Sequence, residues 1–192
     1  MTPAPERGTL VRAATCTDAG AIAHVQVDTW RATYGGIVPE AYLADLSYEA
    51  RERQWVRILC GAGREVTDAA HRRATVFVAE DDAGEVAGFA SGGPERTGDY
   101  PAYTGELYAI YVRRGCQHLG LGRRLVVEVA RYLQRQGHRS MLVLVLAANE
   151  PARRFYERMG AAFVAEREAE IGGAVLPDAV YGWATLDGLT MA

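Results

Sequence analysis

The sequence contains no lysine, because all 21 of its basic residues are arginine. This absence excludes a lysine Schiff base and a Walker-type phosphate-binding lysine as the centre of its chemistry. Long hydrophobic runs are also missing: the longest, residues 141–148, is far shorter than the roughly 18 residues that suggest a membrane span. The N-terminus has no apolar signal segment, so we expect a cytoplasmic protein that contacts no membrane.

Cysteine is scarce, and the three cysteines are Cys16, Cys60 and Cys116. An odd and widely spaced set is typical neither of a disulfide framework nor of a zinc motif, so we expect three unpaired thiols in a reducing compartment. The sequence also lacks the Gly-x-Ser-x-Gly, His-Glu-x-x-His and Cys-x-x-Cys motifs, and its four histidines are isolated. These absences argue against serine-hydrolase, zinc-protease and dithiol redox chemistry.

Charge is unevenly distributed around a net value of −3. Residues 113–158 hold ten arginines and three acidic residues, a net charge of +7, whereas the remainder holds 11 arginines and 21 acidic residues, a net charge of −10. The net negative charge predicts no affinity for nucleic acid. The asymmetry indicates one half that holds an anion and another that attracts a cation, unless the arginines are solvated helix faces.

The length of 192 residues suggests one domain, against a prior of roughly 150 residues per domain. We expect a flexible tail over residues 1–8 and a single domain over 9–192. Hydrophobic periodicity and turn signals predict strands and helices in mixed order, a fold of the α/β (α+β) class. The predicted strands cover residues 9–14, 75–80, 85–91, 106–112, 141–146, 163–170 and 179–186. The predicted helices begin at Thr17, Pro39, Ser47, Gly120 and Asn149.

The segment from Gln117 to Arg124, Gln-His-Leu-Gly-Leu-Gly-Arg-Arg, follows a strand and opens a long amphipathic helix. Glycines allow backbone amides to approach a ligand closely, and the helix N-terminus favours an anion such as a pyrophosphate. A Walker A loop needs lysine after its last glycine, where this chain has Arg123. A dinucleotide fingerprint needs a third glycine, where this chain has Leu125.

Together with the strand ending Ile110-Tyr111-Val112, the Gln-x-x-Gly-x-Gly pattern resembles the acetyl-CoA signature of the GNAT superfamily of N-acetyltransferases. The segment Asn149 to Gly160, with Phe155-Tyr156-Glu157, is similar to the downstream motif of that family. The resemblance extends over residues 9–186. Two features depart from the pattern: the proline before the glutamine loop is absent, and the usual Gly-Phe is stretched to Gly160-Ala-Ala-Phe163.

The resemblance implies a mostly antiparallel sheet of about seven strands, flanked by helices and splayed between residues 106–112 and 141–146 to hold CoA. It implies acetyl-CoA as co-substrate and no metal. The implied cofactor-binding residues are Ile110, Tyr111, Val112, Gln117, His118, Leu119, Gly120, Leu121, Gly122, Arg123 and Asn149. For the ribose phosphate, Arg123, Arg154 and Arg158 are equal candidates.

Two catalytic residues follow from the resemblance and from chemistry. Tyr156 corresponds to the tyrosine that protonates the departing thiolate in many members of the family. Glu106 is a candidate general base or counter-ion for a cationic amine, and the alternative for it is an exposed carboxylate at a strand end. Trp30 and Tyr34 either line the acceptor pocket or pack the first helix.

We therefore expect an N-acetyltransferase that moves the acetyl group of acetyl-CoA to a primary amine by direct attack. The acidic N-terminal region favours a small cationic molecule as the acceptor. Two alternatives remain: a protein N-terminus or lysine as the acceptor, or a CoA-binding module without catalysis. Homodimer formation also stays open.

Overall fold

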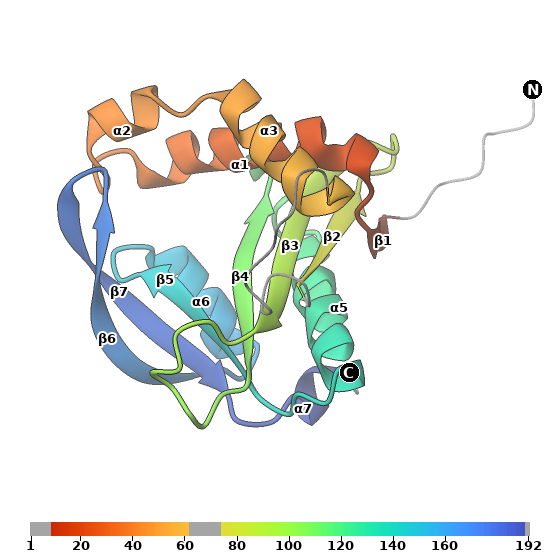
Figure 1. Cartoon of the computed structure of the whole chain (residues 1–192), viewed down its shortest axis with the longest axis vertical. Coiled ribbons are helices and arrows are strands. Elements are labelled where there is room, and N and C mark those ends of the chain that lie inside the picture. Colours follow the sequence, from red (N-terminus) through yellow and green to blue (C-terminus); the bar gives the residue numbers. More distant parts are fainter. Residues whose placement is uncertain (1–8, 62–73, 191–192) are drawn as a thin grey trace, which may run out of the picture.

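The computed structural model describes residues 9–61 and 74–190, and the predicted tail lies outside them. Seven strands form one sheet in the order β1-β2-β3-β4-β5-β7-β6 (Figure 1). The strands are β1 (Leu10–Ala13), β2 (Thr75–Glu80), β3 (Val86–Pro94), β4 (Gly105–Val112), β5 (Met141–Leu146), β6 (Ala162–Ile171) and β7 (Ala174–Trp183). All neighbours pair antiparallel except β4 and β5. This confirms the predicted mixed, mostly antiparallel sheet.

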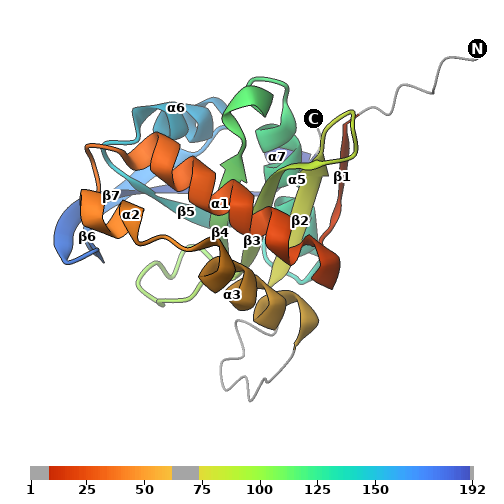
Figure 2. The same cartoon turned by 90° about the horizontal axis from the view of Figure 1, so that it is seen from above.

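Helices cover both faces of the sheet, as Figure 2 shows from above. On one face lie α1 (Ala19–Tyr34), α2 (Glu40–Ala44) and α3 (Tyr48–Cys60), and on the other lie α5 (Leu121–Arg135) and α6 (Glu150–Arg158). Two short 3-10 helices, η1 (Cys16–Asp18) and η2 (Arg114–Cys116), and the final helix α7 (Asp187–Thr190) complete the described elements.

The helix boundaries follow from local capping. Ser47 accepts a hydrogen bond from the amide of Ala50 at 3.2 Å, and Asn149 accepts one from Ala152 at 3.3 Å. These N-caps begin α3 and α6 where the sequence predicts them. Gly137 adopts φ = +89° after the last turn of α5, a conformation that a side chain would disfavour.

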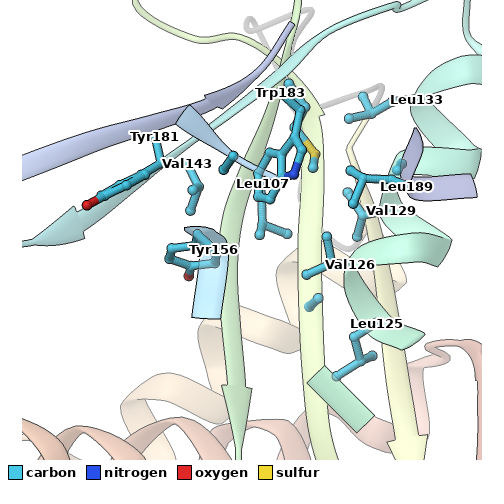
Figure 3. Close-up of a cluster of buried hydrophobic side chains, with 14 of the residues drawn as sticks. Leu107, Leu125, Val126, Val129, Leu133, Val143, Tyr156, Tyr181, Trp183 and Leu189 are labelled. Atoms are coloured by element: carbon cyan, nitrogen blue, oxygen red, sulfur yellow. The ribbon is translucent and has the colours of Figure 1, made fainter. Parts of the chain in front are cut away.

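The largest core cluster lies between the sheet and the α5–α6 layer. The leucines of α5 at positions 121, 125 and 133 are buried there, on the side of the sheet that carries Leu107 and Val143. Figure 3 shows this cluster reaching from α5 to Tyr156, Tyr181 and Trp183. A second cluster packs Ile22, Val25 and Trp55 against the opposite face.

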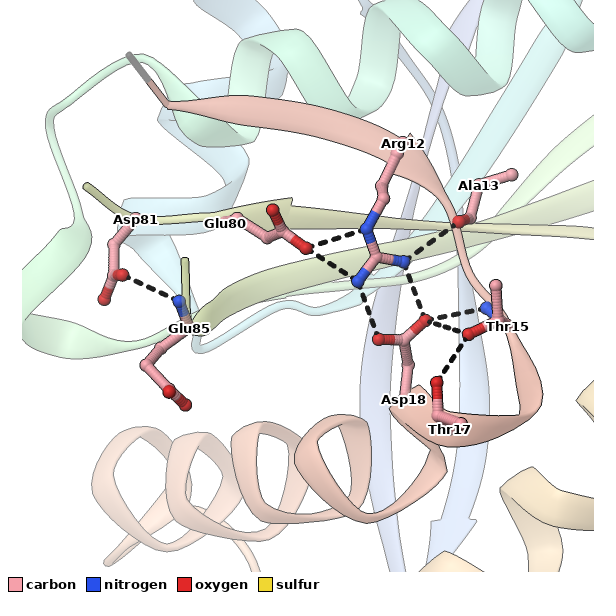
Figure 4. A network of polar contacts seen from close by, with 8 residues as sticks. All are labelled: Arg12, Ala13, Thr15, Thr17, Asp18, Glu80, Asp81 and Glu85. Carbon is pink, nitrogen blue, oxygen red and sulfur yellow. Dashed lines mark hydrogen bonds and ion pairs between the residues drawn. The ribbon is translucent and has the colours of Figure 1, made fainter. Parts of the chain in front are cut away.

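An arginine fixes the start of α1 to the sheet (Figure 4). Arg12 of β1 donates to both carboxylate oxygens of Asp18 at 2.8 Å and to Glu80 of β2 at 2.7 Å. The guanidinium and the amide of Thr15 lower the pKa of Asp18 to about 2. The helix that faces the splayed part of the sheet is therefore held at its N-terminus by an ion-pair network.

Three sequence predictions need correction. Cys16 and Cys60 form a disulfide that joins η1 to the end of α3, so the prediction of unpaired thiols holds only for Cys116. The strand predicted to end at residue 91 continues as β3 to Pro94, and the ladder to β4 has a bulge at Tyr108. The predicted last strand, 179–186, instead begins at Ala174 and ends at Trp183, because Gly172 and Gly173 make a tight hairpin.

No helix of the described residues is long and apolar enough to cross a membrane.

Candidate active site

The sheet opens between β4 and β5. Only three residue pairs join these strands, and the last pair is Leu107 with Val143. Tyr108 is an extra residue in the ladder between β3 and β4, and a bulge of this kind bends its strand away from the neighbour. From residue 108 to 112, β4 therefore has a strand partner only on the β3 side. Polar groups on the open side are available to a ligand.

The glycine-containing loop stands at the far end of this open stretch. His118 and Gly120 adopt φ = +64° and +80°, two left-handed residues that turn the chain into the start of α5. Among the residues that the structure describes, none accepts a hydrogen bond from the backbone amides of residues 118–123. Consecutive free amides at a helix N-terminus form a site for an anionic group.

Side chains hold the loop against the open strand. The amide group of Gln117 donates to the carbonyl oxygen of Val112 at 3.1 Å. A Cβ on Gly122 would lie 3.3 Å from Phe155 and 4.0 Å from Ile110, so glycine permits α5, α6 and β4 to approach closely here. The side chain of Leu121 is buried in the core, which leaves only its backbone for a ligand.

Tyr156 lies on α6 with its ring packed among Phe155, Tyr181 and Trp183. In Figure 3 its oxygen points away from Trp183. The residue is 5% exposed, and no described residue hydrogen-bonds to its hydroxyl. Burial raises the pKa of Tyr156 above its ordinary value, so the hydroxyl keeps its proton at neutral pH.

Tyrosines from three elements gather at the opening. Charge on Tyr34 of α1 influences the pKa values of both Tyr111 of β4 and Tyr156 of α6, and burial raises all three pKa values. Trp30 donates to the Tyr111 hydroxyl at 2.8 Å, and Asn149 donates to the Tyr34 hydroxyl at 3.4 Å. The side chains of Trp30 and Tyr34 thus lie at the opening as well as packing α1, so the two interpretations of them are compatible.

Glu106 occupies the paired end of β4. It is 1% exposed, which overturns the alternative of an exposed strand-end carboxylate. Arg96 saturates it: the backbone amide and Nε of Arg96 donate to Oε2 at 3.2 and 3.0 Å, and a further guanidinium nitrogen bonds Oε1. The guanidinium also lies 4.1 Å above the ring of Tyr108. Sequence reasoning missed Arg96, which belongs to a loop without a recognisable pattern.

The remaining predicted site residues differ in their exposure and in their partners. Asn149 caps α6 beside the opening. Arg123 and Arg158 are exposed, whereas Arg154 pairs with Glu150 at 2.7 Å on the surface of α6. The other predicted residues lie on the unpaired part of β4 and in the loop that follows it, next to one another along the chain.

Known proteins share this architecture. The profile of the Acetyltransferase (GNAT) family matches residues 29–161. The chain belongs to this family. An uncharacterized N-acetyltransferase, YuaI of Bacillus subtilis (strain 168), is 41% identical over 180 residues, which span 93% of this chain and 95% of YuaI. The activity class is therefore that of an acetyl-CoA-dependent N-acetyltransferase.

Solved structures agree in fold. The structure of yncA from Salmonella typhimurium, with its cofactor acetyl-CoA, has a TM-score of 0.66 at 23% identity and covers 94% of this chain and 95% of its own. A GNAT superfamily phosphinothricin acetyltransferase from Sinorhizobium meliloti, in complex with acetyl-CoA, has a TM-score of 0.65 at 19% identity, covering 91% and 87%. At this level of identity, the likeness extends to the fold alone.

Proposed function

We propose that this N-acetyltransferase transfers the acetyl group of acetyl-CoA to the primary amine of a small molecule by direct attack. The observation that carries the proposal is the juxtaposition of an open stretch of β4 with the unpartnered hydroxyl of Tyr156. Structural neighbours with acetyl-CoA support the co-substrate. The amine nitrogen would form a bond to the thioester carbon while the carbon–sulfur bond breaks.

The chain's own groups fit the parts of acetyl-CoA. The free amides of residues 118–123 suit the pyrophosphate, and the unpaired edge of residues 110–112 suits the amide-rich pantetheine arm as an added strand. The backbone amide of Val112 would polarise the thioester carbonyl. Asn149 stands beside this path at the start of α6. The exposed Arg123 and Arg158 are better placed to receive the ribose phosphate than the paired Arg154.

Tyr156 would stabilise the departing thiolate. Because burial raises its pKa, Tyr156 is a hydrogen-bond donor at every pH near neutral. Its proton moves to sulfur only when negative charge develops there, and the proton released by the acceptor amine restores the balance. The role requires no enzyme-bound intermediate.

A pair of glycine variants tests the cofactor site. Gly120 and Gly137 flank α5, both have positive φ, and a Cβ on either meets no atom within 4 Å. Gly120→Ala and Gly137→Ala should therefore destabilise the fold by a similar amount, about 1 kcal/mol. We expect calorimetry to show weaker acetyl-CoA binding for Gly120→Ala alone. Equal affinities for both variants would contradict the proposed cofactor loop.

Turnover tests the reaction. Loss of thioester absorbance, measured with a panel of small amines, should be faster than in buffer for at least one amine. Acetyl-CoA binding without any such acceleration would instead favour a CoA-binding module without catalysis. Faster acetylation of a peptide N-terminus or a peptide lysine than of any small amine would overturn the small-molecule acceptor.

A further inference from the structure

Asp178 is a buried carboxylate that the reaction scheme above does not use. It lies on β7 between Leu146 of β5 and Arg167 of β6, and it is 9% exposed. Among residues 9–61 and 74–190, no group forms a hydrogen bond or an ion pair with its carboxylate. Burying a carboxylate without a partner is costly for folding. A carboxylate of this kind is available to bind a cationic ligand.

The register of the sheet shows which way Asp178 points. Residues directly opposite each other in an antiparallel pair share a face. Leu146, opposite Asp178, and Leu176, two residues earlier, both pack in the cluster formed with α1 and α2. Asp178 therefore points to the same face as α1 and α2. No fully buried side-chain oxygen of the described residues lacks a partner, so the unpartnered carboxylate retains access to solvent.

Asp178 shares its surroundings with the tyrosines of the opening. Its charge contributes to the raised pKa of Tyr34, whose own charge acts on Tyr111 and Tyr156. The rings of Tyr34 and Tyr42 lie 4.8 and 5.8 Å from that of Trp30. We call Trp30, Tyr34, Tyr42 and Tyr111 the aromatic group. Aromatic faces next to a carboxylate provide favourable electrostatics for an organic ammonium ion.

We propose that Asp178 and the aromatic group bind the ammonium form of the acceptor, so that the acceptor is a cationic amine. This inference rests on the proposed acetyl transfer. In the bound complex, one N–H bond of the ammonium breaks and an O–H bond forms on Asp178. The nitrogen keeps the electron pair and becomes the neutral nucleophile that attacks the thioester. The proton then leaves Asp178 to solvent, or to the thiolate by way of Tyr156.

Glu106 is less suited to this task, although both carboxylates face the same side of the sheet. Its two oxygens already accept hydrogen bonds from Arg96, and that cation competes with a substrate ammonium. Burial raises the pKa of Asp178, which makes it a stronger base than an ordinary carboxylate. The groups whose charges act across this space are Tyr34 from α1 and Arg167 from β6, and Arg167 opposes the shift.

The test compares Asp178→Asn with Asp82→Asn, which removes the same charge from an exposed position in the β2–β3 turn. The acceptors assayed are spermidine, phenethylamine, L-lysine and L-alanine. With the best of them, Asp178→Asn should raise the KM for the amine about 10- to 100-fold, because a charge-assisted hydrogen bond is lost. Affinity for acetyl-CoA should stay unchanged, and Asp82→Asn should behave as wild type.

The outcomes separate this inference from the proposed function. A wild-type enzyme that acetylates an amine, with an unchanged KM in Asp178→Asn, overturns the ammonium site and leaves the acetyl transfer intact. If none of the amines accelerates thioester loss in the wild-type enzyme, both the ammonium site and the acetyl transfer are overturned. Proton removal by Asp178 predicts that kcat/KM rises more steeply with pH in Asp178→Asn than in the wild type. In the variant, only amine that is already neutral in solution can react. Parallel pH profiles would leave Asp178 without that task and overturn this step.

Discussion

The two sides of the opening in the sheet differ in how their polar groups are satisfied. On the β4 side, Glu106 is saturated by Arg96, and the Tyr111 hydroxyl accepts a hydrogen bond from Trp30. On the β5–β7 side, no described residue hydrogen-bonds to the Tyr156 hydroxyl or to the Asp178 carboxylate. The bond between Asn149 and Tyr34, at 3.4 Å, lies near the limit for a hydrogen bond.

This difference separates groups that complete the fold from groups that remain available to a substrate. A buried polar group whose partners are all present contributes to a defined structure, whereas an unpartnered one costs folding energy and is available to bind a ligand. Burial alone does not distinguish Glu106 from Asp178, since both are at least nine-tenths buried. Their hydrogen-bond partners do distinguish them.

The largest effect should come from the unpartnered hydroxyl. Tyr156→Phe should lower kcat by roughly 10²- to 10⁴-fold, the usual contribution of a positioned acid, with little change in affinity for acetyl-CoA. Steady-state kinetics with a saturating amine provides the measurement.

Tyr181→Phe is the matched control. Its hydroxyl already has two partners, since it donates to Glu157 at 2.7 Å and accepts from Arg153 at 3.1 Å, while its ring neighbours that of Tyr156. This variant should lose stability and keep its kcat. A wild-type kcat in Tyr156→Phe would mean that the thiolate leaves without help from this residue.

On the β4 side we expect a change in stability. Arg96→Met leaves the buried carboxylate of Glu106 without its partner. The free energy of unfolding should fall by about 2–3 kcal/mol, less than for a fully buried pair because the Arg96 side chain is 40% exposed. Urea denaturation measures the loss. Adding Glu106→Gln should restore part of it, and a double variant no more stable than Arg96→Met would show that the pair contributes little.

The sequence predicts the elements around the opening much better than it predicts the contacts between distant side chains. The strand 106–112, the loop and the cap at Asn149 depend on local signals: an apolar run, glycines with positive φ, and a capping side chain. Each of these acts within a few residues, so the pattern predicts them without tertiary information. The saturation of Glu106 depends instead on Arg96, ten residues away in an irregular loop, and no local rule predicts that contact.

Asp178 escaped prediction for a related reason. The segment Gly172 to Pro177 contains two glycines and a proline, which indicate a turn, so Asp178 falls in a predicted connection. In the structure β7 begins at Ala174, and the carbonyl of Pro177 accepts a hydrogen bond from Ala147 at 2.8 Å. The disulfide between Cys16 and Cys60 likewise joins residues 44 positions apart, and only the folded chain brings them together.

The pH dependence of stability should distinguish Asp18, an aspartate with an ion-pair partner, from Asp178, which has none among the described residues. Its folded-state pKa of about 2 lies below the ordinary 3.8, so its stabilisation is fully present above pH 3.8 and is lost as pH falls toward 2. Asp18→Asn should lower the free energy of unfolding at pH 7 by about 1–2 kcal/mol, after allowance for the partly exposed Arg12. Urea denaturation at several pH values should show the difference from wild type shrinking toward pH 2. A difference independent of pH would argue against the ion pair as its source.

Asp178→Asn should produce the smallest change in stability, and it should stabilise the protein rather than destabilise it. Its pKa is raised by burial, so in the pH range just above 3.8 the folded protein binds more protons than the unfolded protein. The free energy of unfolding of the wild type therefore falls as pH rises through that range, and the cost of the buried charge is complete at neutral pH. Asparagine removes this cost, and the variant should melt at a higher temperature than wild type at pH 7.

A gain of 1 kcal/mol corresponds to roughly 2–4 °C for a chain of this size. The gain should shrink as pH falls toward 3.8, because the raised pKa keeps more of the wild-type carboxyl protonated in the folded protein than in the unfolded protein. Calorimetric melting at pH 4 and pH 7 measures it, with Asp82→Asn as the control for net charge. A variant less stable than wild type at both pH values would show that a partner satisfies Asp178, and the two sides of the opening would then no longer differ.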